Sequence, residues 1–243
     1  MNRLLVPGAT AGDVTVDGPR FHYLARVLRL EAGAALEVFD GKGHAFDATL
    51  VSLGEASARL SLGPPRDAPR ARAITVVQGL PKGDKLELVL QKGTELGVAA
   101  FAPAACARSV VKLDEKAAAS RVARWQKIVE EAARQCGRAD VPRVERPAPL
   151  AAAVAALEGA PAVFVLDEAE RAVSLSQAFA TLADAPTPLA LVVGPEGGLD
   201  RAEVGALVAR GATPVTLGRL VLRTETAALA AVSVLRHLDG ELG

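Results

Sequence analysis

The sequence predicts an α/β protein with a mostly parallel sheet, preceded by a small β-barrel. From residue 73 onward, apolar strands alternate with amphipathic helices, the pattern of a sheet covered by helices on both faces. Before residue 63, short strands follow one another with a single helix among them. Residues 63–72 (GPPRDAPRAR) lack apolar periodicity and are rich in Pro and Arg, as linkers are. We therefore expect two domains, 1–70 and 73–243.

The first domain is expected to contain one helix among its strands. Residues 21–30 (FHYLARVLRL) carry apolar residues at helical spacing. Two strands within residues 35–53 flank Asp40-Gly41-Lys42-Gly43, a strong hairpin signal, and a third strand covers residues 56–62. Consecutive strands on short turns suggest the small barrel.

The second domain shows the alternation most clearly. Strands are expected at residues 73–80, 98–106, 161–168, 188–194 and 213–218. Helices are expected at residues 84–97, 116–136, 201–210 and 224–238, with the Ala-rich stretch 151–160 as a further helix. Ligands of open α/β sheets usually bind just past the carboxyl ends of the strands, so the loops at that edge are the candidate site.

The composition allows a full hydrophobic core and points to an uneven charge distribution. Half of the 243 residues are hydrophobic and only 3% are aromatic, so few rings are available to stack on bases. The formal net charge is zero, but residues 78–146 carry 13 Lys and Arg against 9 Asp and Glu, while residues 147–243 carry 6 against 11. The cationic middle could neutralise phosphates, although ordinary solvated helix faces give the same pattern.

Several classes of protein lack their signatures here. Cys106 and Cys136 give no disulfide framework, and no signal peptide or long apolar segment is evident, so a cytoplasmic location is expected. No dinucleotide-binding, Walker A or nucleophile-elbow motif follows a strand. His22, His44 and His237 lie far apart without metal-ligand spacing, so no metal site is expected.

The first candidate loop is Gly194-Pro195-Glu196-Gly197-Gly198, directly after a buried strand. Glycines around a proline give a rigid turn whose backbone can approach a ligand closely and offer N–H and C=O groups. Asp200 is a good N-cap for the helix that follows. A tight strand-to-helix turn without any ligand would explain the same residues.

The second candidate loop, residues 217–227 (LGRLVLRTETA), joins a strand to the last helix and is unusually apolar. Exposed Leu and Val would be costly, so we expect the segment to pack against something. Thr224 is suited to cap the helix and Glu225 suits its dipole, which is the purely structural explanation. Arg223 opposes that dipole, so we expect it to meet an anion or a polar substrate edge.

Five ordered motifs point to a known family: FHYLARVLRL, QGLPKGDKLELVLQKGTELGV at 78–98, EAARQCGRADVPRV at 131–144, LVVGPEGG at 191–198 and LRTETAALAAV at 222–232. With them the chain resembles the SPOUT superfamily and, within it, the ribosomal RNA small subunit methyltransferase E family. The resemblance implies an N-terminal PUA-like β-barrel and a C-terminal α/β-knot, a trefoil-knotted parallel sheet whose last helix threads through a loop, an exception to the usual rule against knots.

The resemblance also implies an activity and partners. Members of the family use S-adenosylmethionine to methylate N3 of a uridine in 16S ribosomal RNA, in the decoding region of the small subunit, and they act as homodimers. The residues carried over to the cofactor site are Leu166, Asp167, Gly194, Pro195, Glu196, Gly197, Gly198, Leu217, Gly218, Leu222, Thr224, Thr226 and Ala227.

The reaction needs a cation beside the uracil carbonyl oxygens, where negative charge develops, and a base for the N3 proton. Arg223 is the candidate cation, and Glu225 or Glu196 is the candidate base. The family commonly carries an arginine two residues after the LG pair. Leu220 stands there in this chain and Arg219 lies one position earlier, which leaves open whether Arg219 takes that arginine's place.

The expected RNA contacts are cations of the first domain's helix and of the cationic middle; each could equally be an ordinary surface charge. They are Arg26, Arg29, Lys82, Lys92, Arg108, Arg134 and Arg138. Two other functions stay open. One is a non-catalytic RNA-binding module with the α/β part as a dimerisation scaffold, which an intact GPEGG and LRTETA argue against. The other is a knotted methyltransferase acting on tRNA or on a ribose 2′-hydroxyl.

Overall fold

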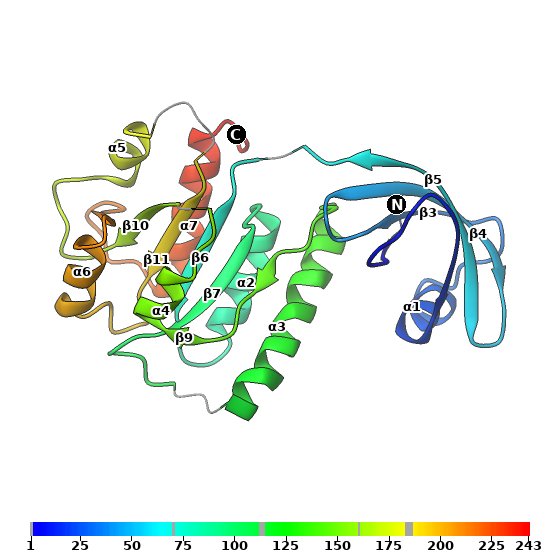
Figure 1. Ribbon diagram of the computed structural model, residues 1–243, viewed down its shortest axis with the longest axis horizontal. Helices are drawn as coiled ribbons and strands as arrows, with labels where there is room; N and C mark the ends of the chain where they lie inside the picture. Colours follow the sequence, from blue (N-terminus) through cyan, green and yellow to red (C-terminus); the bar gives the residue numbers. More distant parts are fainter. Residues whose placement is uncertain (1, 70, 112–114, 160, 183–186) are drawn as a thin grey trace. The chain divides into compact units, whose positions relative to one another are not determined.

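The computed structural model describes residues 2–69, 71–111, 115–159, 161–182 and 187–243 (Figure 1). The chain divides into two compact units. The N-terminal unit comprises Met1–Arg70 and Glu130–Val141, and the C-terminal unit comprises Ala71–Val129 and Pro142–Gly243. Residue 70, where we expect the first domain to end, lies outside the described residues. Within those ranges, no helix is both long and apolar enough to cross a membrane.

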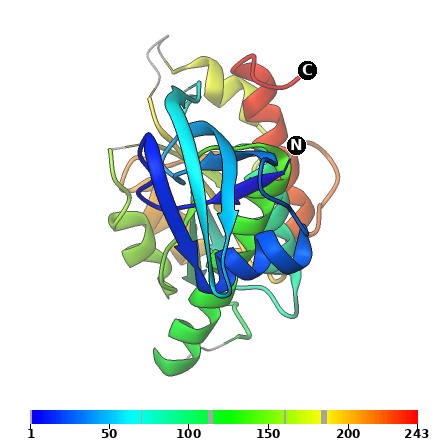
Figure 2. The ribbon, with the colours of Figure 1, turned by 90° about the vertical axis from the view of Figure 1, so that its right-hand side faces the viewer.

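The N-terminal unit is built on a curled sheet (Figure 2). Its strands are β1 (Arg3–Leu5), β2 (Gly12–Asp17), β3 (Ala35–Phe39), β4 (His44–Leu53) and β5 (Ser57–Asp67). They lie in the order β1-β3-β4-β5-β2, with only the β1–β3 pair parallel among the described strands. Leu24, Leu36, Leu50 and Leu60 are fully buried in its core. Strand β5 runs to Asp67, so the first half of the expected linker is strand.

The helix of this unit differs from the expected one. Helix α1 spans Gly18–His22 and continues as one turn of π-helix, Tyr23–Val27, instead of a regular helix over residues 21–30. Two residues beyond this turn, Arg29 has a φ of 51°, in the left-handed region. That conformation costs a non-glycine residue about 1 kcal/mol, and the Arg29 side chain is exposed.

Residues 130–141 belong to the N-terminal unit because hydrogen bonds tie them to its sheet. The Arg3 guanidinium donates to the Glu37 carboxylate at 2.6 Å and to the carbonyls of Ala133, Arg134 and Arg138 at 3.0–3.1 Å. These carbonyls lie at and beyond the end of a helix, where carbonyl groups are short of intrahelical N–H partners. The Ala133 carbonyl also accepts from the Arg138 N–H at 3.1 Å. The expected second domain, continuous over 73–243, is therefore interrupted by a segment that packs with the first.

The hairpin expected around residues 40–43 is present and also contacts this segment. The Asp40 carboxylate accepts hydrogen bonds from the N–H groups of Lys42 and His44, at 2.7 and 3.0 Å, which closes the turn. The Gly43 N–H donates to the carbonyl of Ala139 at 3.2 Å. Ala139 is buried beside Phe39.

The C-terminal unit contains, among its described residues, a seven-stranded parallel sheet. Its strands are β6 (Ile74–Gly79), β7 (Ala100–Ala105), β8 (Arg143–Val144), β9 (Ala148–Pro149), β10 (Ala162–Leu166), β11 (Leu189–Val193) and β12 (Thr213–Val215). The order is β12-β10-β11-β6-β7-β8, and β9 also pairs with β7. The five expected strands are thus confirmed, each shorter than its apolar run.

Helices cover this sheet on both faces (Figure 1). They are α2 (Lys85–Glu95), α3 (Glu115–Cys136), α4 (Leu150–Ala155), α5 (Leu175–Ala180), α6 (Arg201–Val208) and α7 (Thr224–Leu238), and the last turns of α3 belong to the N-terminal unit. Helices α4 and α6 pack on Val77, Val165 and Val192. Helix α7 packs on β6 and β11 and against α2 and α5. The expected α/β class is confirmed.

Candidate functional site

A cavity of about 380 Å³ opens at the carboxyl ends of β10, β11 and β12. Its walls are three loops, within residues 166–171, 193–201 and 215–224, together with Lys85 and Ala227. Both candidate loops of the sequence are among them. All the residues expected at the cofactor site line this cavity, except Gly197 and Thr226.

The last helix begins against the glycine-rich turn. Thr224 is only 6% exposed, and its hydroxyl donates a hydrogen bond to the Gly194 carbonyl at 2.6 Å. The same oxygen accepts a hydrogen bond from the Gln78 amide at 2.8 Å. The expectation that Thr224 caps the helix is therefore wrong. Arg223 holds the N-cap position without a side-chain hydrogen bond, and Thr224 joins the turn to the end of β6.

This contact leaves no space for larger residues. A Cβ on Gly79 would lie 2.6 Å from Pro195, and one on Gly194 would lie 2.9 Å from the backbone nitrogen of Leu199. Gly198 has a φ of +70°, which L side chains rarely adopt. Glycine is thus required both by close approach and by backbone conformation, whatever the turn binds.

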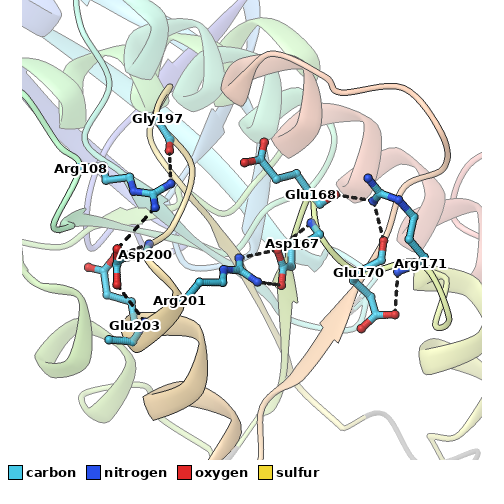
Figure 3. A network of polar contacts seen from close by, with 11 residues as sticks. Arg108, Asp167, Glu168, Glu170, Arg171, Gly197, Asp200, Arg201 and Glu203 are labelled. Atoms are coloured by element: carbon cyan, nitrogen blue, oxygen red, sulfur yellow. Dashed lines mark hydrogen bonds and ion pairs between the residues drawn. The ribbon is translucent and has the colours of Figure 1, made fainter.

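The far side of the turn is fixed by α6. Asp200 caps the helix as expected, its carboxylate accepting from the Ala202 N–H, and Glu203 accepts from the Asp200 N–H. The Arg108 guanidinium donates to the Gly197 carbonyl at 3.0 Å and approaches the Asp200 carboxylate at 3.4 Å (Figure 3). These contacts hold the turn from outside the cavity.

Asp167 is held by a cation that the sequence analysis missed. Its two carboxylate oxygens accept hydrogen bonds from the Arg201 guanidinium at 2.6 and 2.8 Å (Figure 3). These hydrogen bonds keep the pKa of Asp167 below its ordinary value. Asp167 lines the cavity, but its carboxylate is committed to Arg201. The signal available in sequence was an arginine in the first helical position after an N-cap, where a cation opposes the dipole.

Glu168 was also missed, although it follows Asp167 at the end of a strand. It is exposed, lines the cavity, and forms no ion pair with any described residue. Its side chain points away from Arg171, which instead donates to the backbone carbonyl of Glu168 (Figure 3). Glu168 is thus a carboxylate available to a ligand.

The three candidate catalytic residues lie in different environments. Arg223 is exposed on the cavity wall. The Glu196 carboxylate accepts from the Lys85 ammonium at 2.7 Å and the Lys82 N–H at 2.9 Å. Burial alone would raise the pKa of Glu196, but these hydrogen bonds outweigh it and lower the pKa. Glu196 is therefore poorly suited to take up a proton.

Glu225 keeps one carboxylate oxygen uncommitted. Its Oε2 is buried and has no hydrogen-bond partner in the described part of the chain. The residue lies in the first turn of α7, next to the cavity-lining Thr224, but does not itself line the cavity. Of the two candidate bases, only Glu225 has an oxygen without a hydrogen-bond partner among the described residues, whereas only Glu196 lines the cavity.

The apolar loop is only partly packed, contrary to expectation. Leu217 and Leu222 are half-buried on the cavity wall, whereas Leu220 and Val221 are 81% and 75% exposed. Gly218 precedes this exposed pair and has a φ of +119°, which favours glycine. The backbone groups of residues 219–222 form no hydrogen bond with the described residues. The tip of this loop therefore projects from the C-terminal unit.

The candidate RNA-binding cations of the N-terminal unit fall into two groups. Arg26 and Arg29 are exposed at the π-helical turn. Arg134 stacks over the Tyr23 ring at 4.1 Å and pairs with Glu131. The Arg138 side chain is 15% exposed and pairs with Asp140. These contacts give Arg134 and Arg138 roles in building the unit and leave Arg26 and Arg29 as the accessible pair.

The candidate cations of the C-terminal unit are less uniform. Lys82 is exposed beside Glu196, to which only its backbone N–H donates. Lys92 pairs with Glu95 at 2.8 Å along helix α2. Arg108 supports the glycine-rich turn, as described above. Within the described residues, no group of three or more His, Cys, Asp or Glu is placed to hold a metal ion.

Comparison with known proteins identifies the class. Residues 68–236 match the RNA methyltransferase domain family, and residues 16–62 match the RNA methyltransferase PUA domain family. A crystal structure of a ribosomal RNA small subunit methyltransferase E from Neisseria gonorrhoeae, bound to S-adenosyl methionine, superposes with a TM-score of 0.85 at 33% identity and covers 98% of each chain. The fold and the cavity thus define an RNA methyltransferase of the SPOUT type with a PUA-like N-terminal domain.

Relatives that match over most of this chain narrow the class further. Ribosomal RNA small subunit methyltransferase E of Bacillus subtilis is 36% identical over 228 residues, which cover 92% of this chain and 89% of that protein. The protein of the same name from Synechocystis is 32% identical and covers 93% of this chain and 73% of its own. The chain belongs to the ribosomal RNA small subunit methyltransferase E family, which confirms the resemblance found in the sequence.

Replacing Thr224 by Val should lower the free energy of unfolding by about 2 kcal/mol, because two buried hydrogen bonds are lost. The Gly194 carbonyl would keep only a 3.5 Å contact with the Gln78 amide, which would keep its bond to the Gly79 carbonyl. Thr224→Ser, which keeps the hydroxyl, should lose less than half as much. Urea unfolding followed by circular dichroism measures both. Thr226→Val is the control, since Thr226 is exposed in the same helical turn. Equal losses at positions 224 and 226 would contradict the role given to Thr224.

Proposed function

We propose that this protein transfers a methyl group from S-adenosylmethionine to N3 of a uridine in 16S ribosomal RNA, in the decoding region of the small subunit. The main support is the cavity between the glycine-rich turn and the apolar loop. Most of the residues that the family resemblance predicts for the cofactor site line this cavity. The relatives named above act on small-subunit ribosomal RNA by name. A cytoplasmic location follows from such a substrate.

The cavity fits the cofactor. Its volume of about 380 Å³ lies within the usual range for small-molecule sites. Leu217 and Leu222 offer apolar surface for a flat ring, and the uncommitted backbone groups of residues 219–222 can hydrogen-bond to its edge. Glu168 supplies a negative charge for a cationic ligand. When bound, S-adenosylmethionine supplies the methyl group on a positively charged sulfur.

Residues of the protein must then remove the N3 proton and stabilise the charge that its loss creates. Loss of that proton places negative charge on the two uracil carbonyl oxygens. The Arg223 guanidinium, exposed on the cavity wall, is the group that would stabilise this charge. We assign proton uptake to Glu225 rather than Glu196, because Lys85 and the Lys82 N–H hold the Glu196 carboxylate in its ionised form.

Nucleoside mass spectrometry tests the proposed function directly. Small subunits lacking the modification, free 16S RNA and bulk tRNA are each incubated with protein and labelled S-adenosylmethionine. We expect 3-methyluridine in the ribosomal substrates only. A 2′-O-methyl product or a methylated tRNA would support a different knotted methyltransferase. Cofactor binding with no product in any substrate would contradict the catalytic assignment.

Arg223→Ala should reduce kcat by about a hundredfold while the Kd for S-adenosylmethionine changes little, because the charge that Arg223 meets develops in the transition state. Arg223→Lys should recover part of the loss. Single-turnover methylation and calorimetric titration of the cofactor separate the two quantities. Normal turnover with weakened cofactor binding would place Arg223 in the donor site instead.

Glu168→Gln should raise the Kd for S-adenosylmethionine about tenfold, as expected for loss of one charge interaction of about 1.4 kcal/mol. The Kd for S-adenosylhomocysteine, whose sulfur is neutral, should rise less. Calorimetry measures both ligands. Glu241→Gln, at an exposed carboxylate near the C-terminus, is the control. Equal effects on the two ligands would mean that Glu168 binds a part of the cofactor that they share.

Arg29→Gly should raise the free energy of unfolding by about 1 kcal/mol, because glycine tolerates the left-handed backbone found there. RNA affinity should fall, and the slope of log K against log salt should flatten by about one unit if one phosphate contact is lost. Arg29→Lys keeps the charge and the strain, so it should resemble the wild type in both measurements. Unchanged RNA binding by Arg29→Gly would make Arg29 an ordinary surface residue.

We also propose a homodimer, with α7 in the interface. Ala227, Leu229, Ala230 and Val234 are only half-buried on this helix, and so they offer apolar surface to a partner. Light scattering at micromolar concentration should give twice the 25.0 kDa of one chain. Leu229→Glu should shift the protein toward the monomer. A wild-type protein that remains at 25.0 kDa would contradict the proposal.

A further inference from the structure

The tip of the apolar loop is the most exposed hydrophobic feature of the described residues. Leu220 is 81% exposed and Val221 is 75% exposed, ahead of Val110 at 66%. Both lie on the wall of the cavity. An exposed aliphatic pair beside a ligand site commonly marks a contact surface. Its exposure to water is unfavourable, and a bound partner removes this cost by covering the side chains.

The tip is held in place at both ends. On one side, the Thr216 hydroxyl donates to the Gly218 carbonyl at 3.1 Å and accepts from the Gly218 N–H at 3.2 Å. On the other side, Thr224 is fixed to the Gly194 carbonyl. Leu217 and Leu222 anchor the loop on the cavity wall. Leu220 and Val221 therefore project from a fixed base at the edge of the cavity.

The charges on the loop indicate what covers the tip. Arg219 and Arg223 flank the aliphatic pair; both are exposed, and neither forms an ion pair with a described residue. Residues 217–223 include no acidic residue. An aliphatic tip between two cations matches a nucleic acid, which offers phosphates beside stacked bases. A symmetric contact centred on the tip would bring these arginines toward one another without acidic partners in the loop.

The position of the acceptor atom in RNA suggests what the tip does. N3 lies on the edge of uracil that forms base pairs, and a stacked base cannot enter a cavity of this kind. Enzymes that act on such atoms turn the nucleotide out of the stack, at a cost of a few kcal/mol. Aliphatic side chains that fill the gap offset that cost.

We propose that Leu220 and Val221 form a wedge that enters the RNA stack where the acceptor uridine has turned out into the cavity, with Arg219 contacting the neighbouring phosphate. This inference rests on the proposed function. Arg223 is then free to contact the uracil, while Arg219 contacts a phosphate of the RNA backbone. The partner surface is thus a gap in stacked RNA rather than a second copy of the chain.

The test uses the full chain with both tip residues changed to serine, Leu220→Ser with Val221→Ser. Val208→Ser, which alters an exposed aliphatic residue of α6, is the control. The probe is a small-subunit RNA hairpin with 2-aminopurine in place of the acceptor uridine, bound in the presence of S-adenosylhomocysteine. Wild-type and control proteins should raise its fluorescence as the base unstacks, and the serine variant should give less than a third of that rise.

Methylation supplies a second readout. On the stacked hairpin, the serine variant should lose at least tenfold in kcat while its Kd for S-adenosylmethionine stays within twofold of the wild type. On a hairpin whose acceptor uridine is flanked by abasic nucleotides, the loss should fall below threefold, because little stacking remains to be broken. Leu220→Met with Val221→Ile should restore activity on the stacked hairpin.

Three results would overturn the wedge. Equal losses on both hairpins would place the tip in the reacting site. A serine variant that becomes monomeric where the wild type is dimeric would make the tip a contact between copies. Full fluorescence and activity would make it ordinary surface. Methylation by the wild-type protein is measured first. If the wild type forms no 3-methyluridine, the proposed function is contradicted. If it does, the variants test the wedge alone.

Discussion

The Thr224 hydroxyl joins three segments that are far apart in the sequence. Gln78 is the penultimate residue of β6, Gly194 opens the glycine-rich turn, and Thr224 begins α7. Their two hydrogen bonds meet at one buried oxygen. Close packing of Gly79 on Pro195 allows no side chain between β6 and the turn. Two of the three cavity walls therefore take their position from this contact. A site formed in this way is largely preorganised before any ligand binds.

Electrostatic pairing completes the arrangement. Arg201 holds Asp167, and Lys85 holds Glu196, so each pair joins a loop of the cavity to a neighbouring helix. Because both carboxylates are paired, Glu168 is left as the acidic group of the cavity without an ion pair among the described residues. The cations on the remaining wall, Arg219 and Arg223, face solvent. Paired and unpaired charges are thus separated within one cavity.

Local patterns in the sequence predict most of this fold, but not its long-range contacts. The strands and helices of the C-terminal unit and the Asp200 cap follow from periodicity and capping rules, which depend on near neighbours. Thr224 satisfies the same local rule and yet bonds to Gly194, since a buried partner thirty residues away cannot be seen in a local pattern. Arg134 was expected on RNA for its charge alone, whereas the structure places it over Tyr23. The family resemblance predicts which loops form the cavity. The structure is needed to tell which of their side chains are paired and which are free to meet a ligand.

The hydrogen bonds of Arg3 have a consequence for how this protein can be rearranged. The N-terminal unit needs Glu130–Val141, which the gene encodes inside the catalytic domain. Cutting the chain in the linker would strip the sheet of a segment that covers Phe39 and satisfies Arg3. Exchange of the N-terminal unit between enzymes of this architecture therefore requires two coordinated crossovers rather than one. Such a requirement favours inheritance of the two units together.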